Sequence, residues 1–357
     1  MKYFLIAGEL SGDQHGARLI IDIIHRDPTA IFYFWGGDAM SKASGQKPLK
    51  HCKELAFMGF KEVILNLSTI YKNFKIIKSQ ISLYSPDVVV FIDYPGFNLR
   101  LAPWVKKQNM ITWYYISPTV WAWKSGRKEI IRKYIDRMMV IFPFEVDWYK
   151  SHGIDVEYQG NPSYESLKHF QPAPNFINQN NLQKPYIALI PGSRAQEINN
   201  LLPIMLETAQ HFSKTHQIVI AKAQHLDLHL YTEIIKSYNF EPTILENATH
   251  DIMYHAQAAL ITSGTATLEA AILGLPHVVC YKTSSINYFI AKLFVKLEYI
   301  GLPNIIMNTS IVPEFIQNDC TVAKLQPALQ KILNISQESR KHLFTELAAK
   351  LEFSKMN

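Results

Sequence analysis

Short apolar runs of strand type alternate with longer helical patterns along almost the whole chain. The runs are Tyr3–Ala7, Val88–Ile92, Thr112–Ile116 and Met138–Phe142 in the first half, and Tyr186–Ile190, Ile218–Ala221, Ala259–Thr262 and His277–Cys280 in the second. In the first half each run is followed by Gly, Asp, Ser or Pro. Apolar strands joined by crossover helices are typical of parallel sheets covered on both faces. The alternation therefore predicts an α/β protein.

A cluster of Pro and Asn without apolar periodicity separates the two halves. It covers residues 171–175 and 178–181, and such clusters indicate a linker. The 357 residues also exceed what one hydrophobic core usually serves. We therefore predict two doubly wound, Rossmann-like domains facing a cleft, at residues 1–170 and 182–330, and then a helical segment at 331–357. Ligands of such sheets bind outside the carboxyl ends of the strands.

The composition excludes several classes of protein. Cys52, Cys280 and Cys320 are widely spaced, which argues against a disulfide framework or a zinc ribbon and favours a reducing compartment. Glu9 and Asp13 interrupt the N-terminal apolar run before a signal sequence forms. No apolar run reaches spanning length, so we expect only peripheral membrane contact. The net charge of +6 suits a nucleotide, a phosphorylated lipid or a membrane face, but it is too small to indicate nucleic acid.

The loop at residues 8–16 follows a strand and opens a helix. Its glycines let a ligand approach the backbone, and the start of the helix favours an anion. Three of its side chains could transfer protons, which favours a functional loop. The alternative is a tight turn with an Asp helix cap. The candidate residues are Glu9, Ser11, Gly12, Asp13 and His15.

Asp93 follows a fully apolar strand, in the segment that ends at Asn98. A carboxylate in such a poorly solvated place has a raised pKa, which suits a general base. The alternative is a structural Asp that caps the following Pro-Gly turn.

Two tryptophans and a basic cluster occupy residues 116–135. Trp121 and Trp123 precede Arg127 and further Lys and Arg residues on a helical pattern. This combination suits sugar stacking or an anionic lipid headgroup. Core tryptophans beside a solvated helix face are an equally good interpretation.

Two loops of the second half have the same design, in which a strand is followed by Gly, hydroxyl groups and a helix. Backbone N–H groups of such loops, with one Arg, suit a diphosphate. Glu269 lies one turn beyond Thr265 on the same helix face, where it could accept both hydroxyls of a ribose. The two loops together predict a nucleotide site. Its candidate residues are Gly192, Ser193, Arg194, Gly264, Thr265 and Glu269.

Two other patterns carry little weight. His225 and His229 have a metal-like spacing, but the Glu of a zincin motif is missing and no third ligand is evident, so we predict no metal site. No Gly-x-Ser-x-Gly elbow supports a hydrolase.

Taken together, these segments resemble the lipid-A-disaccharide synthases, a family of inverting GT-B glycosyltransferases of Gram-negative bacteria. The matching pieces lie in family order over nearly the whole chain. They are residues 8–17, 92–98, 117–123, 142–145, 191–194 and 263–269.

The resemblance implies that a UDP-2,3-diacylglucosamine gives its sugar to the 6-hydroxyl of 2,3-diacylglucosamine 1-phosphate, with a β-1,6 link and release of UDP. It implies no metal and no cofactor. Asp93 is then the first choice for the general base, with His15 or Glu9 in reserve. Arg194 would hold the diphosphate and Glu269 the ribose. Asn304 and Glu314 lie in further segments that resemble the family's donor site.

The resemblance also implies a cytoplasmic enzyme at the inner membrane, with C-terminal helices that return to the first domain and a possible homodimer. An apolar, basic segment at 57–78 is our candidate membrane patch. Asn161 stands where the family usually has His, and Gly96 where many members have Asp. The alternatives are another UDP-N-acetylhexosamine enzyme of this fold, namely a peptidoglycan transferase or a 2-epimerase, and a non-catalytic nucleotide-sugar or lipid-binding protein.

Overall fold

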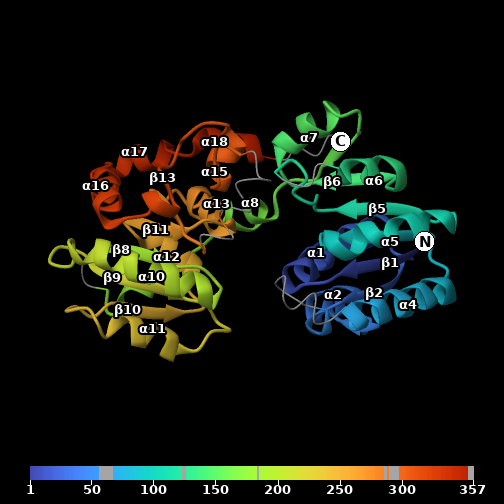
Figure 1. Cartoon of the computed structure of the whole chain (residues 1–357), viewed down its shortest axis with the longest axis horizontal. Coiled ribbons are helices and arrows are strands. Elements are labelled where there is room, and N and C mark those ends of the chain that lie inside the picture. The colour runs from blue at the N-terminus through green and yellow to red at the C-terminus, as the bar shows by residue number, and fades with distance from the viewer. Residues whose placement is uncertain (56–66, 123–125, 183–184, 285–287, 289–296, 353–357) are drawn as a thin grey trace. The chain divides into compact units, whose positions relative to one another are not determined.

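The computed structural model describes residues 1–55, 67–122, 126–182, 185–284, 288 and 297–352. The chain forms two compact units, Met1–Gln159 and Gly160–Asn357 (Figure 1). The division falls earlier in the chain than the boundary that we predicted at residue 170. Among the described residues, no helix is both long and apolar enough to cross a membrane.

The first unit contains a parallel sheet of seven strands in the order β3-β2-β1-β4-β5-β6-β7. The strands are β1 (Lys2–Ala7), β2 (Ile31–Gly36), β3 (Lys50–His51), β4 (Val88–Ile92), β5 (Ile111–Tyr115), β6 (Arg137–Val140) and β7 (Glu157–Tyr158). The strand order reverses between β1 and β4. The carboxyl ends of these two strands therefore flank the point where open α/β sheets bind ligands.

Helices cover both faces of this sheet, as the alternation of buried side chains requires. They are α1 (Leu10–Arg26), α2 (Asp38–Ser44), α4 (Leu67–Tyr84), α5 (Pro95–Lys107), α6 (Arg127–Tyr134) and α7 (Pro143–Lys150), with a 3-10 turn η1 (Cys52–Glu54). Leu5 and Val90 pack with Ile20 of α1 on one face. Phe4 and the neighbouring strands pack with helices α4 and α5 on the other.

The second unit has a parallel sheet of six strands in the order β10-β9-β8-β11-β12-β13. The strands are β8 (Tyr186–Ile190), β9 (Gln217–Lys222), β10 (Thr243–Glu246), β11 (Ala258–Thr262), β12 (His277–Tyr281) and β13 (Glu314–Ile316). Here the order reverses between β8 and β11. The two loops predicted to bind a nucleotide follow these two strands.

Two apolar clusters again cover the two faces of the sheet, one with α10, α11 and α16, the other with α9, α12 and α13. The helices are α8 (Pro162–Leu167), α9 (Phe176–Gln179), α10 (Ala195–Gln210), α11 (Leu228–Ile235), α12 (Thr249–His255), α13 (Thr265–Ile272), α15 (Leu302–Met307), α16 (Val322–Leu333), α17 (Gln337–His342) and α18 (Thr345–Leu351), with a 3-10 turn η2 (Gln317–Asp319). Helix α18 packs on α13 and α15 within this unit. Its return to the first domain stays a prediction.

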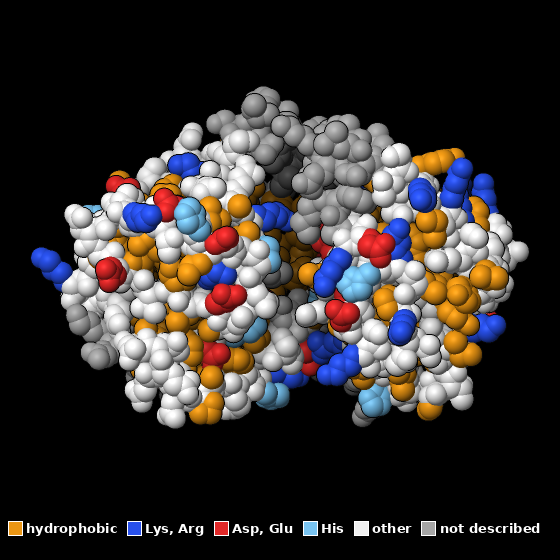
Figure 2. All heavy atoms as spheres, turned by 90° about the horizontal axis from the view of Figure 1, so that it is seen from below, with side chains coloured by type: hydrophobic (Ala, Val, Ile, Leu, Met, Phe, Trp, Pro, Cys, Tyr) orange, Lys and Arg blue, Asp and Glu red, His pale blue; other side chains and the backbone are white. Residues whose placement is uncertain are grey.

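On the face shown in Figure 2, acidic and basic side chains are interspersed on both units. Among the described side chains of that face, hydrophobic groups lie between the charged ones. The basic excess of the chain is therefore not gathered there into one surface.

Candidate active site

The turn after β4 holds Asp93 and Tyr94 in a left-handed backbone conformation, which is strained at Tyr94. Asp93 and Tyr94 have φ angles of 43° and 47°, in the left-handed region that side chains other than Asn, Asp and Gly rarely adopt. The Asp93 carbonyl oxygen accepts hydrogen bonds from Asn98 Nδ2 at 2.8 Å and from the Tyr114 hydroxyl at 2.7 Å. Its N–H donates to the Tyr115 carbonyl at 3.0 Å. These contacts stabilise a conformation that the backbone alone disfavours.

The Asp93 carboxyl group has the electrostatics of a general base. Burial and, to a smaller extent, the charge of the Glu9 carboxylate raise its pKa to about 6, against the opposing effect of a hydrogen bond from the Tyr94 backbone. Glu9 immediately precedes α1, at the carboxyl end of β1, the strand that pairs with β4. A base with this pKa is mostly ionised at neutral pH but still takes a proton readily.

The loops after β1 and β4 approach each other closely at Gly8. A Cβ atom on Gly8 would lie 2.4 Å from Cγ of the Tyr94 ring. Only glycine therefore leaves room for the Tyr94 ring over this loop. The ring also stacks on Phe97, with 5.5 Å between centroids.

Asn98 is completely buried and supports the turn from below. Its Nδ2 donates to the carbonyl oxygens of Asp93, Ile92 and Ile6 at 2.8, 3.3 and 3.4 Å. Its Oδ1 has no hydrogen-bond partner in the described part of the chain. We predicted Asn98 as an acceptor-side residue, and the structure places it beneath Asp93.

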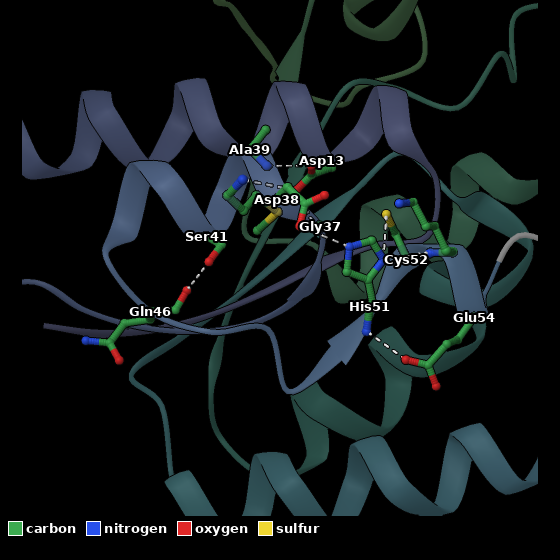
Figure 3. Close-up of polar contacts among 11 residues, drawn as sticks. Asp13, Gly37, Asp38, Ala39, Ser41, Gln46, His51, Cys52 and Glu54 are labelled. Atoms are coloured by element: carbon green, nitrogen blue, oxygen red, sulfur yellow. Dashed lines mark hydrogen bonds and ion pairs between the residues drawn. The ribbon is translucent and has the colours of Figure 1, made fainter. Parts of the chain in front are cut away.

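Asp13 caps a helix from another part of the chain. It is buried, and its carboxylate accepts hydrogen bonds from the N–H groups of Gly37, Ala39 and Met40 at 2.6, 2.9 and 3.1 Å. Figure 3 shows these contacts at the start of α2. The sequence suggested a cap of the local turn, whereas the structure shows a cap of α2. With three donors bound, Asp13 is a positioning residue and not an open acid.

The other residues of the first loop differ in their surroundings. His15 is half-buried, its ring lies 6.4 Å from that of Tyr115, and burial together with Arg18 lowers its pKa. None of the described contacts joins His15 to Asp93. Ser11 is exposed, and Gly12 is buried.

Trp121 is held by a buried carboxylate that the sequence analysis did not single out. Trp121 Nε1 donates to Glu145 Oε1 at 3.1 Å, and the N–H groups of Ile141 and Phe142 donate to its Oε2 at 3.2 and 3.0 Å. Burial raises the pKa of Glu145 to about 7. The signal was present as Phe-Pro-Phe-Glu, with Glu at the third helical position of a capping box. Trp123 lies outside the described residues.

Arg127 begins α6 and is partly buried. Burial lowers the pKa of its guanidinium, and the Tyr114 hydroxyl that contacts Asp93 opposes this.

The second unit has a pocket of about 370 Å³ at the carboxyl ends of β8, β9 and β11, a volume in the range of small-ligand sites. It brings together five of the eight residues predicted to bind the donor, namely Gly192, Ser193, Arg194, Gly264 and Thr265. The remaining three are Glu269, Asn304 and Glu314, which are not among its lining residues.

The loop after β8 already binds a carboxylate of its own chain. Glu197 Oε2 accepts from the N–H groups of Ser193 and Arg194 at 3.0 and 3.2 Å. Gly192 has a φ of 107°, and a Cβ there would lie 2.3 Å from Glu197 Oε2. Glu197 thus fixes the loop and occupies two amides that we expected to face a diphosphate. The Arg194 side chain, 69% exposed, is the cation of this loop, and its Nη1 lies 3.4 Å from Glu197 Oε1.

Lys222 is a buried cation in the same pocket that the sequence analysis missed. Its side chain is 7% exposed, and Nζ lies 3.0 Å from Glu246 Oε2 and 3.3 Å from the Ala223 carbonyl oxygen. It comes from the last position of β9. The sequence contains no signal for this role. A Lys at the end of a strand is common, and only its burial in the fold distinguishes Lys222.

Glu269 lies one turn beyond Thr265 on α13, as its spacing predicts. Its Oε2 is 3.1 Å from His250 Nε2, and this contact raises the pKa of His250.

Asn304 and Glu314 form a closed network of their own. Asn304 is fully buried, accepts from the Ile311 and Val312 N–H groups, and donates to Glu314 Oε1 at 2.6 Å. Glu314 also accepts from the backbone N–H groups at 300 and 301. In the structure both residues shape the turn around α15. Both polar atoms of the Asn304 side chain are used in these hydrogen bonds, so none is left to bind the sugar donor.

Comparison with known proteins decides the family. Residues 3–357 match the family described as lipid-A-disaccharide synthetase. The chain belongs to this family. It is 33% identical to the lipid-A-disaccharide synthase of Geobacter sulfurreducens over 93% of this chain and 88% of that protein. The enzyme of the same name from Syntrophus aciditrophicus is 35% identical, over 96% and 91% of the two chains.

Solved structures of low sequence identity share the fold. The UDP-GlcNAc 2-epimerase of Methanocaldococcus jannaschii, in complex with UDP-GlcNAc and UDP, gives a TM-score of 0.62 at 13% identity, over 98% of this chain and all of that one. The UDP-N-acetylglucosamine 2-epimerase of Rickettsia bellii gives 0.60 at 15% identity, over 98% and 94%. The chain thus has the GT-B fold with two Rossmann-like units, as its sequence predicted.

Two residues depart from the usual family pattern. One of them caps a helix, and the other is an exposed glycine. Asn161 is buried, and its side chain accepts from the Tyr164 N–H to cap α8. Gly96 is exposed, with open space where a side chain would be.

His229 is paired with Glu233 at 3.3 Å, and the described residues contain no group of three His, Cys, Asp or Glu able to hold a metal. Residues 57–66 of the predicted membrane patch lie outside the described residues, and its remaining part, residues 67–78, belongs to α4.

Proposed function

We propose that this protein transfers the sugar of UDP-2,3-diacylglucosamine to the 6-hydroxyl of 2,3-diacylglucosamine 1-phosphate and releases UDP. The observation that carries the proposal is Asp93, a desolvated carboxylate on a strained turn at the reversal point of the first sheet. Strained, buried titratable groups of this kind cluster at catalytic sites. Membership of the lipid-A-disaccharide synthetase family supplies the reaction class.

Asp93 acts as the general base in a single displacement. Its carboxylate takes the proton of the acceptor hydroxyl, whose oxygen forms the new bond to the anomeric carbon while the bond from that carbon to the UDP oxygen breaks. The configuration inverts because attack and departure occur on opposite sides. His15 and Glu9 are the reserve candidates for the base, and Glu9 acts on Asp93 through its charge.

The pocket of the second unit receives UDP. Arg194 and Lys222 supply positive charge for the leaving diphosphate, and Thr265 and Ala266 at the start of α13 line the same pocket. Glu269 accepts the ribose hydroxyls. The likeness to 2-epimerases supports the fold only, since the identity is 13%.

The remaining parts of the proposal concern location. Acylated substrates reside in a membrane, so the enzyme works peripherally on the cytoplasmic face of the inner membrane, where its net charge of +6 favours anionic lipid. The C-terminal helices return to the first domain, and two copies form a dimer. No nucleic acid takes part.

Release of UDP by the purified protein tests the function. With acylated donor and acceptor present, we expect UDP and a disaccharide 1-phosphate in equal amounts, and no UDP release when the acceptor is omitted. The same assay with EDTA should give the same rate. Absence of product would contradict the proposed function, and loss of activity with EDTA would contradict a metal-independent mechanism.

A further inference from the structure

The carboxylate of Glu269 is shared between two helices beside the donor pocket. Its Oε2 lies 3.1 Å from Nε2 of His250, the second residue of α12. The preceding residue, Thr249, lines the pocket, as does Thr265 one turn before Glu269. The pair therefore lies at the margin of the pocket, where α12 and α13 meet.

The surroundings of His250 favour a lasting contact with Glu269. The ring packs edge-on against Phe170, with 5.9 Å between centroids. The hydrogen bond to Glu269 raises the pKa of His250, burial lowers it, and the charges of Glu269 on α13 and Asp251 on α12 raise it. Glu269 is 22% exposed and His250 41%, so a ligand can still reach the carboxylate.

We propose that His250 is a positioning residue of the donor site, which orients the Glu269 carboxylate toward the ribose hydroxyls of the nucleotide. The inference rests on the proposed function, in which Glu269 binds the ribose. A carboxylate accepts at two oxygens, so Oε1 stays available while Oε2 accepts from His250. A free Glu side chain loses rotamer freedom when it binds a ligand, whereas one already held by His250 has lost that freedom on folding.

The simpler alternative is that the pair only links α12 to α13. Such a link would affect stability, but it could not distinguish nucleotides by their ribose hydroxyls. Ligand discrimination therefore separates the two roles.

The test compares UDP with 2′,3′-dideoxy-UDP by isothermal titration calorimetry. We expect His250→Leu to weaken UDP binding by about tenfold, the contribution of one charge-assisted hydrogen bond, and to leave dideoxy-UDP binding unchanged. His250→Gln keeps a donor and should restore most of the affinity. His229→Leu is the matched control, since His229 pairs with Glu233 on α11 and does not line the pocket.

The pH dependence of UDP affinity provides a second test. UDP affinity of the unaltered enzyme should fall as the pH rises through the raised pKa of His250, while that of His250→Gln should not follow this step. Equal losses for both nucleotides in His250→Leu, or no loss, would overturn the inference. Failure of the unaltered enzyme to bind UDP, or equal affinity of the unaltered enzyme for UDP and dideoxy-UDP, would instead contradict the proposed donor site.

Discussion

Two acidic loops of the first unit follow neighbouring strands of one sheet, yet their carboxylates differ in the hydrogen bonds that they accept. Asp13 accepts three backbone hydrogen bonds and stabilises α2. Asp93 receives support for its backbone from Asn98 and Tyr114, while its carboxylate is desolvated and its pKa is raised to about 6. The number of donors around each carboxylate, and not its place after a strand, separates a structural group from a reactive one.

Asp93→Asn should have the largest effect on activity. An active variant would contradict the distinction between a reactive Asp93 and a structural Asp13. A general base contributes roughly 10²- to 10⁴-fold in rate, so we expect kcat to fall by about 10³ with UDP affinity unchanged. Steady-state kinetics and UDP titration measure the two quantities. Loss of UDP binding together with activity would show that Asp93 is structural.

The same variant should not destabilise the fold. The pKa of Asp93 is higher in the folded chain than in the unfolded chain, so its contribution to stability is greatest below its unfolded pKa and is lost as the pH rises through about 6. At pH 8 the neutral Asn should therefore leave the free energy of unfolding unchanged or raised. Denaturant unfolding at pH 5 and pH 8 provides the measurement.

Asp13→Ala should show the opposite behaviour. It leaves the N–H groups of Gly37, Ala39 and Met40 without their acceptor, and we expect the free energy of unfolding to fall by about 2–4 kcal/mol. Urea unfolding measures this loss. At a temperature where the variant remains folded, its pH dependence of activity should match that of the unaltered enzyme. A changed apparent pKa would mean that Asp13 acts in the chemistry after all.

The pH dependence of the unaltered enzyme gives a third comparison. Activity needs the ionised form of Asp93, so kcat/KM should rise about tenfold per pH unit below pH 6 and level off above it. Glu9→Gln removes a negative charge that raises the pKa of Asp93, and it should shift the rise to lower pH. An unshifted profile would separate Glu9 from Asp93.

The sequence predicted the central architecture and much less of the contacts. All eight apolar runs are strands in the structure, because central strands of parallel sheets are apolar on both faces. The edge strands β3 and β7, two residues each, carry too little pattern to detect. The aromatic strand β2 had a signal that we did not use.

For the site, the sequence located the loops and not the partners. Asp93 and Glu269 could be found because each follows a strand in a recognisable segment. His250 and Lys222 could not, since their roles depend on burial and on residues brought close by the fold, whereas Glu145 carried a capping-box signal that we did not use. Asn304 and Glu314 show the opposite case. Both lie in segments that resemble the family's donor site, and in the structure their side chains stabilise a neighbouring turn.

The smallest predicted effect concerns UDP affinity and the two cations of the donor pocket, one buried and one exposed. Arg194 is 69% exposed and pairs with Glu197 at 3.4 Å, whereas Lys222 is 7% exposed and pairs with Glu246 at 3.0 Å. Charge acts more strongly where water is excluded, so Lys222→Met should weaken UDP binding by about tenfold and Arg194→Met by less. Lys236→Met, which alters an exposed Lys on the surface, is the control. If Lys222→Met lowered the melting temperature and left UDP affinity unchanged, Lys222 would serve only to join β9 to β10, and Arg194 would remain the cation that meets the diphosphate.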